Sequence, residues 1–170
     1  MAEAVGEPSD DEALWRFSLA FYAHAGVSEV LIRLQDRAGL DVNLMLFALW
    51  LGVSGRRRLT SEELVMADRI VHPIRTGIVE PLRALRRKLR SDPDLDLQRL
   101  REAVKELELA AERIIQTRLA RTAAPPGSDT HPAARAAVAR ANLALYLGPE
   151  MARSAEAATI REVLEGFVRD

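Results

Sequence analysis

The chain contains no cysteine, which excludes a disulfide framework, a thiol nucleophile and a thiolate metal site together. It also has almost no net charge, −1 over 170 residues, so its composition implies no bulk electrostatic partner. No apolar run reaches the roughly 20 residues that cross a bilayer. What is present, 48% hydrophobic and 29% charged residues, is typical of a globular protein large enough for one domain.

The N-terminal segment MAEAVGEPSDDE is acidic and lacks the basic start and apolar stretch of a signal peptide. We therefore expect a cytoplasmic protein. Residues 1–9 are expected to be disordered, residues 10–147 to form one helical domain, and residues 148–170 to add a C-terminal helix.

Residues 42–51 carry the strongest structural signal, because every one of them except Asn43 is apolar. A helix that is apolar all round must be surrounded by other helices. The remaining sequence has helix caps and glycine stops at regular intervals and no strand pattern. It predicts an all-α, single-domain bundle of about seven to eight helices around a buried central helix at 42–51.

Local signals predict where several helices begin and end. Asp41 should cap the buried helix, and Thr60 with Glu63 should form a capping box. Pro73 and Pro81 each remove a backbone donor, so we expect a break near His72.

The longest predicted helix follows Asp92-Pro93. Apolar residues recur in it at alternating spacings of three and four, which predicts a seam packed at a shallow angle. The seam residues are Leu97, Leu100, Val104, Leu107, Ala111 and Ile114.

Five segments carry a resemblance to a known family. They are LWRFSLAFYA (14–23), LQDRAGLDVNLMLFALWLG (34–52), PLRALRRKLR (81–90), LELAAERIIQ (107–116) and RANLALYL (140–147). Together they resemble a proteobacterial protein family described only as a domain of unknown function, over residues 14–147. The resemblance supports the helical domain and implies no activity, cofactor or catalytic residue.

Charge is unevenly distributed along the chain. Residues 54–90 hold ten Arg or Lys against four Asp or Glu, whereas residues 91–112 hold three against seven. On the helix predicted after Pro73, an arc of about 80° beside the apolar face holds Arg75, Arg83, Arg86 and Arg90. The candidate binding residues are Arg75, Arg83, Arg86 and Arg87, joined by Arg56, Arg57 and Arg58.

Three interpretations of these arginines compete. Guanidinium groups pair with carboxylates and phosphates, so the arginines fit an acidic protein partner or, alternatively, RNA. The structural alternative is that Glu108 and Glu112, one turn apart on the longest helix, pair with them inside the bundle. For the arginines themselves we favour the structural pairing. As the function of the chain we favour an interaction or regulatory module that presents any arginines left exposed to an acidic protein.

An enzyme or small-ligand binder is the remaining alternative. Its polar site would lie near Gln35, Asp36 and Asn43, with Trp15 and Glu112 as further candidates. The three histidines, His24, His72 and His131, are isolated and lack the Glu-x-x-His spacing of di-metal bundles, so we predict no metal and no cofactor.

Overall fold

A computed structural model describes residues 9–128 and 131–168, and it shows an all-α, single-domain helical bundle. The elements are α1 (Asp10–Tyr22), α2 (Val27–Ala38), α3 (Val42–Val53), α4 (Ser61–Ile74), the π-helical turn η1 (Arg75–Val79), α5 (Glu80–Lys88), α6 (Leu95–Ala120), α7 (Pro132–Met151) and α8 (Ala155–Phe167). No strand occurs in these described ranges. None of the helices found there combines the length and the apolar character that a membrane crossing needs.

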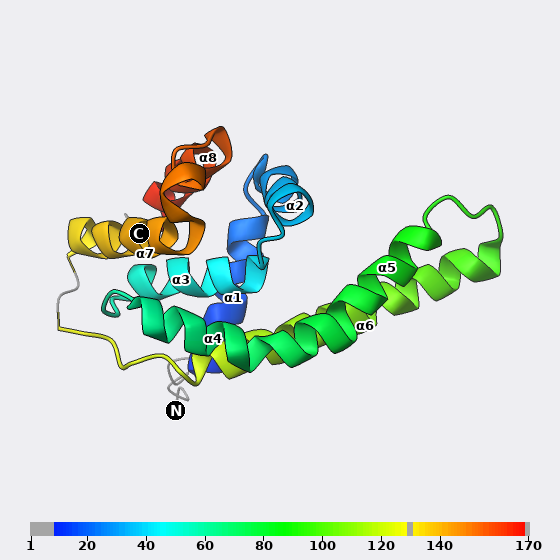
Figure 1. Ribbon diagram of the computed structural model, residues 1–170, viewed down its shortest axis with the longest axis horizontal. Coiled ribbons are helices and arrows are strands. Elements are labelled where there is room, and N and C mark those ends of the chain that lie inside the picture. Colours follow the sequence, from blue (N-terminus) through cyan, green and yellow to red (C-terminus); the bar gives the residue numbers. More distant parts are fainter. Residues whose placement is uncertain (1–8, 129–130, 169–170) are drawn as a thin grey trace, which may run out of the picture.

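The central helix is α3, and all of its residues are buried. It begins where the sequence predicts, because the Asp41 carboxylate accepts hydrogen bonds from the backbone N–H groups of Asn43 and Leu44 at 2.8 and 3.3 Å. Helices α1, α2, α6 and α7 pack against it (Figure 1). Helix α7 crosses so closely at Gly52 that a Cβ there would lie 2.2 Å from the Ala139 nitrogen. The core is therefore a bundle assembled around one apolar helix.

Helices α4 and α5 form one long, continuous helix joined by η1 (Figure 1). Its start confirms the capping box of Thr60 and Glu63. The predicted break near His72 is wrong. Pro73 lies inside α4, and the backbone takes up the missing donor by widening into the π-turn that begins two residues later. The Thr76 hydroxyl donates to the His72 carbonyl at 2.9 Å, and Pro81, which also lacks a backbone donor, lies two residues beyond the π-turn.

Helix α6 runs antiparallel to this long helix, and its first half forms with α5 an arm that projects from the body (Figure 1). Of the six residues of the predicted seam, two are buried and Leu97 is partly buried. Val104 and Ala111 are buried, but Leu100, Leu107 and Ile114 are exposed. The face that packs inward instead carries Glu108 between Val104 and Ala111, because α5 presents arginines rather than apolar side chains to α6.

Two further predictions concern the ends of the chain. Ser9 occupies the N-cap position of α1 without a side-chain hydrogen bond, and residues 1–8 lie outside the described residues, so the disorder predicted for 1–9 falls almost entirely there. At the other end, Gly148 has φ 73° and kinks α7, and Ser154 caps α8. Ile160 and Leu164 of α8 are fully buried in the same core as α3. The C-terminal segment is thus part of the one domain.

Candidate functional site

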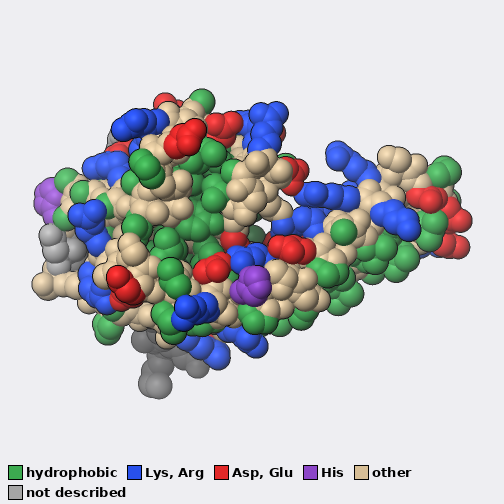
Figure 2. Space-filling view, viewed as in Figure 1, with side chains coloured by type: hydrophobic (Ala, Val, Ile, Leu, Met, Phe, Trp, Pro, Cys, Tyr) green, Lys and Arg blue, Asp and Glu red, His purple; other side chains and the backbone are tan. Residues whose placement is uncertain are grey.

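A cleft separates α2 on the body from α5 on the arm. It consists of two adjoining cavities of about 280 and 240 Å³ that share the lining residues Gln35, Asp36, Arg83 and Arg87. Figure 2 shows this hollow between body and arm, with basic side chains along the arm side. The α2 residues of the predicted polar site and the α5 arginines are therefore the two walls of one cleft.

The outer cavity is strongly cationic. Its wall contains one carboxylate, Asp36, and the exposed apolar side chain of Ile32. The arginines that line it are Arg83, Arg86, Arg87, Arg90 and Arg101. Such a density of guanidinium groups favours an anion that carries carboxylate or phosphate oxygens.

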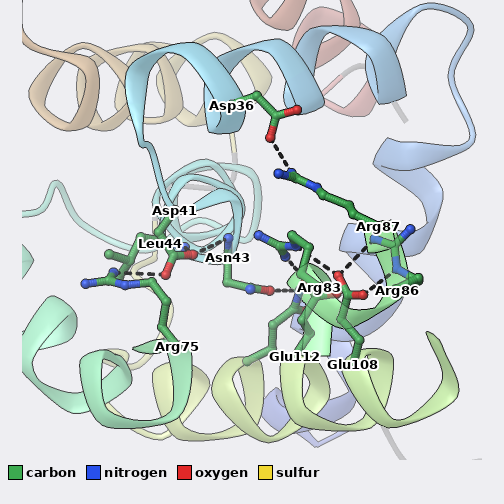
Figure 3. Close-up of polar contacts among 11 residues, drawn as sticks. Asp36, Asp41, Asn43, Leu44, Arg75, Arg83, Arg86, Arg87, Glu108 and Glu112 are labelled. Carbon is green, nitrogen blue, oxygen red and sulfur yellow. Dashed lines mark hydrogen bonds and ion pairs between the residues drawn. The ribbon is translucent and has the colours of Figure 1, made fainter. Parts of the chain in front are cut away.

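Two of these arginines are held by glutamates of α6. Arg83 donates to Glu108 at 2.9 Å and to Glu112 at 2.7 Å, and Arg86 donates to both oxygens of Glu108 at 2.6 and 3.2 Å. Figure 3 shows both arginines pointing down from α5 onto the two glutamates. The structural alternative raised by the sequence is thus found for Arg83 and Arg86. Their side chains join the arm helices instead of facing solvent.

The two glutamates have opposite electrostatic surroundings. Burial by itself would raise the pKa of Glu108, but the hydrogen bonds from Arg86 and Arg83 lower it below its ordinary value. Burial raises the pKa of Glu112, and its single hydrogen bond from Arg83 does not compensate. Glu108 is therefore the carboxylate on which the arm pairing depends.

Arg75 is also engaged, where the cleft meets the body. It donates to Asp41 at 3.0 Å and to Asp68 at 2.8 Å, and Asp41 uses its other oxygen to cap α3 (Figure 3). Asp41 is further fixed by Tyr146, whose hydroxyl accepts from its N–H and donates to its carbonyl. Arg75 thus orients the start of the central helix and is not available to a partner.

Three arginines of the outer cavity are less committed. Arg87 pairs only with Asp36, at 2.5 Å across the mouth of the cleft, and both side chains are about half exposed (Figure 3). Arg90 makes no ion pair with any residue that the structure describes. Arg101 pairs with Glu102 at 2.7 Å on its own helix, and its Nε is, in the same described set, the one buried side-chain nitrogen or oxygen without a hydrogen-bond partner.

Arg56, Arg57 and Arg58 do not join this surface. They precede α4, and the helical segment 61–79 that separates them from α5 spans roughly 28 Å. Arg56 is buried, pairs with Asp10 and lies 4.2 Å from the Trp50 ring centre. Arg57 pairs with Glu63, and Arg58 is exposed. The seven predicted arginines therefore form two separate groups.

The five candidates for a polar site are likewise divided. Gln35, Asp36 and Asn43 line the inner cavity of the cleft, whereas Trp15 and Glu112 line a cavity of only about 40 Å³ that Asn43 also borders. A buried chain of hydrogen bonds runs along this side. The Ser18 hydroxyl donates to the side-chain oxygen of Gln116 at 2.9 Å, and the side-chain nitrogen of Gln116 donates to Oδ1 of Asn43 at 3.0 Å. Asn43 is therefore committed to joining α1, α3 and α6.

Sequence reasoning missed Arg101 and Gln116. Arg101 precedes Glu108 by seven residues, which is two helical turns on one face, so its place beside the cleft was readable once Glu108 was known to point inward. Gln116 gave no comparable signal, because its partners come from α1 and α3. Nowhere in residues 9–128 and 131–168 do three His, Asp or Glu side chains gather as a metal site requires.

Comparison with known proteins adds one family. The sequence model of the family described as "Protein of unknown function (DUF2390)" matches residues 13–119, from the first turn of α1 to the end of α6. No curated protein matches the chain. No solved structure matches it either. The matched region contains both walls of the cleft and the whole arm.

Proposed function

This chain belongs to the DUF2390 family of proteins of unknown function, and we propose from the geometry of its cleft that it is a binding module for an acidic segment of a partner protein. The observation that carries the proposal is the surplus of positive charge in the outer cavity. Five arginines line it against Asp36 alone. Arg83 and Arg86 are neutralised from behind by Glu108 and Glu112. This leaves Arg90, Arg87 with its half-exposed pair to Asp36, and Arg101 with its pair to Glu102 to meet a ligand.

The available donors suit a carboxylate. Arg87 already binds the carboxylate of Asp36, so its guanidinium is oriented to bind the carboxylate of an incoming glutamate or aspartate in the same way. Arg90, which makes no ion pair with a residue that the structure describes, provides further donors along the same wall. Ile32, 57% exposed on the opposite wall, provides an apolar contact. A short segment that combines acidic and apolar residues fits this arrangement.

A protein segment fits better than RNA for two reasons. Neither cavity is lined by an aromatic side chain, whereas single-stranded RNA is usually held by stacking its bases on aromatic rings. The carboxylates of Asp36, Asp41 and Glu80 also line the cleft and would repel a continuous phosphate backbone. Separate carboxylates on a peptide can avoid them.

We assign the residues of the cleft two roles. Arg75, Arg83 and Arg86 position the arm and the start of α3, while Arg87, Arg90 and Arg101 bind the partner. Gln35 lines both cavities and supplies a neutral amide that can donate to or accept from a peptide backbone. The cytoplasm, expected from the N-terminal sequence, is the proposed location of the interaction.

The test is affinity purification of the tagged chain from a cell lysate, with and without nuclease. The double variant Arg87→Glu, Arg90→Glu should lose the partner, with recovery reduced about tenfold or more, since each reversal replaces attraction by repulsion. Arg58→Glu is the matched control, because it reverses an exposed arginine outside the cleft. Its recovery should equal that of the wild type.

Two results would contradict the proposal. Loss of the partner after nuclease treatment would identify RNA as the ligand. Equal recovery by the cleft variant and by Arg58→Glu would show that the cleft is not the binding surface. Fluorescence anisotropy with a labelled hexaglutamate peptide provides a direct check, and its binding should weaken with added salt.

A further inference from the structure

Helix α6 exposes a continuous apolar stripe on the side of the arm that faces away from the cleft. Leu100, Leu107 and Ile114 follow one another at intervals of seven residues and are 46%, 59% and 51% exposed. Ala103 and Ala110, also exposed, lie between them. These five positions fall within an arc of about 80°, which is the a and d pattern of a coiled-coil seam.

The long helix extends this stripe through Ile78 of η1 and Leu85 of α5. Ile78 and Leu85, again seven residues apart, are 47% and 40% exposed. Leu85 lies on the side of α5 roughly opposite Arg87, about 160° away on a helical wheel. Figure 2 shows hydrophobic side chains along the edge of the arm, on the side away from its basic residues. Exposed large apolar side chains that gather along one edge usually mark an interface.

We propose that this stripe binds a second copy of the chain, so that two α6 helices pack antiparallel about a twofold axis. The sizes of the stripe residues are complementary in one antiparallel register. If Leu107 lies opposite Ala110 of the second copy, then Ile114 lies opposite Ala103 and Leu100 opposite Thr117. Each large side chain then faces a small one, which permits close packing of knobs into holes.

The charges beside the stripe match in the same register. Glu106 and Arg113 flank it, are both exposed, and make no ion pair with a residue that the structure describes. The Arg113 guanidinium lies over the Trp15 ring, 5.7 Å from its centre, and retains its charge for a partner. Glu106 and Arg113 occupy equivalent positions, each directly before a large residue of the stripe. In an antiparallel coiled coil such equivalent flanking positions meet, and the register set by Leu107 and Ala110 brings Glu106 opposite Arg113 of the second copy. The twofold axis then creates two such pairs. Size and charge therefore agree on a self-complementary interface, which favours a second copy over an unrelated partner.

This interface is independent of the proposed function, because the arginine cleft lies on the other side of the arm. A dimer would carry two clefts, one on each arm, and would leave Arg87 and Arg90 accessible. Failure of either proposal leaves the other standing.

The first test is sedimentation velocity of the purified full chain. The wild type should be a dimer, and Leu107→Glu should weaken the dimer about a hundredfold or more, since it places four carboxylates around the axis, two from the new residue and two from Glu106. The side chain of Leu107 is mostly exposed, so its replacement should leave the thermal unfolding of the monomer unchanged. Val65→Glu is the matched control, because Val65 is 50% exposed on α4 and lies outside the stripe.

The second test addresses the register. Glu106→Arg and Arg113→Glu should each weaken the dimer. The combination of both should restore it, because opposite charges then face each other again with their positions swapped. The chain has no cysteine, so any disulfide that forms must join the introduced thiols. Ala103→Cys with Ile114→Cys should form a covalent dimer on oxidation, whereas Ala103→Cys alone should not, because its two copies would lie roughly 16 Å apart.

A wild type that remains monomeric at the highest concentration that stays in solution overturns the proposal. So does a dimer that Leu107→Glu leaves intact. Cross-linking by Ala103→Cys alone, without the second thiol, would overturn the antiparallel register.

Discussion

Helices α3 and α5 lie in the same domain and are stabilised in different ways. Every residue of α3 is buried, and its contacts are almost entirely apolar. No residue of α5 is buried, and its firmest attachments are the ion pairs of Arg83 and Arg86 with α6. The body therefore depends on removing apolar surface from water, whereas the arm depends on charge. The arm should respond to salt and pH under conditions that leave the body unchanged.

The largest effect expected is on the body. Trp50→Ala removes a side chain that is 3% exposed, lies against Phe47 and carries the Arg56 guanidinium on its ring. The free energy of unfolding should fall by about 3–5 kcal/mol, measured by urea denaturation, because the surrounding helices cannot collapse into the cavity. Trp15→Ala, at a partly exposed position, is the control and should cost less. Equal costs would show that α3 is not the centre of the core.

The next largest effect is on the arm. Glu108→Gln removes the charge that holds Arg83 and Arg86, and breaking such a buried pair should cost about 3 kcal/mol. The loss should appear as faster exchange of amide hydrogens in α5 and in the first half of α6, with α3 unaffected. A uniform loss of protection across all helices would mean that arm and body unfold as one unit.

Acidification should have the same effect as this substitution. The pKa of Glu108 is lower in the folded chain than in the unfolded chain, where a glutamate titrates at about 4.3. Its contribution to stability is therefore complete above that pH and is lost as the pH falls through the lower, folded pKa. Wild-type arm protection should decrease on acidification below about pH 4, and the Glu108→Gln arm should show little of this dependence.

Salt should separate the two regions in the wild type. At about 1 M NaCl the screening length falls to roughly 3 Å, so the partly exposed pairs of the arm weaken. We expect amide exchange in α5 to accelerate several-fold and exchange in α3 to stay constant or slow down. Potassium sulfate is a useful comparison, since it screens charge and strengthens apolar burial. Acceleration in both helices would contradict the division between them.

The smallest effect is expected at Glu112. Its pKa is raised by burial, so the folded chain disfavours its charged form, and the stability it contributes is present below about pH 4.3 and lost as the pH rises. Near pH 7, Glu112→Gln should therefore change the free energy of unfolding by less than about 1 kcal/mol despite the 2.7 Å contact with Arg83. The same urea titration measures it beside Glu108→Gln. An equal decrease in the free energy of unfolding for the two variants would show that both glutamates stabilise the arm to the same extent.

The helix boundaries could be read from the sequence where the signal is local. Asp41 and the pair Thr60 and Glu63 act within one turn of the backbone, so their spacing alone predicted the starts of α3 and α4. The all-apolar character of residues 42–51 likewise required burial on every side. Neither inference needed to know which helices are neighbours.

Predictions that depended on a neighbour were less successful. Helix α6 has two adjacent faces with apolar spacing, and either could pack against α5. The face with Glu108 packs inward because Glu108 pairs with the arginines of α5, and Leu107 is therefore exposed. The pairing of Glu108 with arginines was foreseen as an alternative, but the separation of Arg56 from Arg83 required the length of the intervening helix. The effect of Pro73 could not be read either, because a π-turn and a break begin with the same missing donor.

The π-turn Arg75–Val79 gives the long helix two rotational phases. A π-turn fits one extra residue into the helix, so everything beyond it is rotated by about 100° relative to an uninterrupted α-helix. The phase of α4 is set by its contacts with the core, and the phase of α5 is set by the glutamates of α6. Deleting the exposed Gly77 would preserve a continuous helix and still carry Arg83 and Arg86 around the axis, away from Glu108. A single residue inserted or deleted at this turn is therefore enough to change the direction in which all the arginines of α5 point, without replacing any of them.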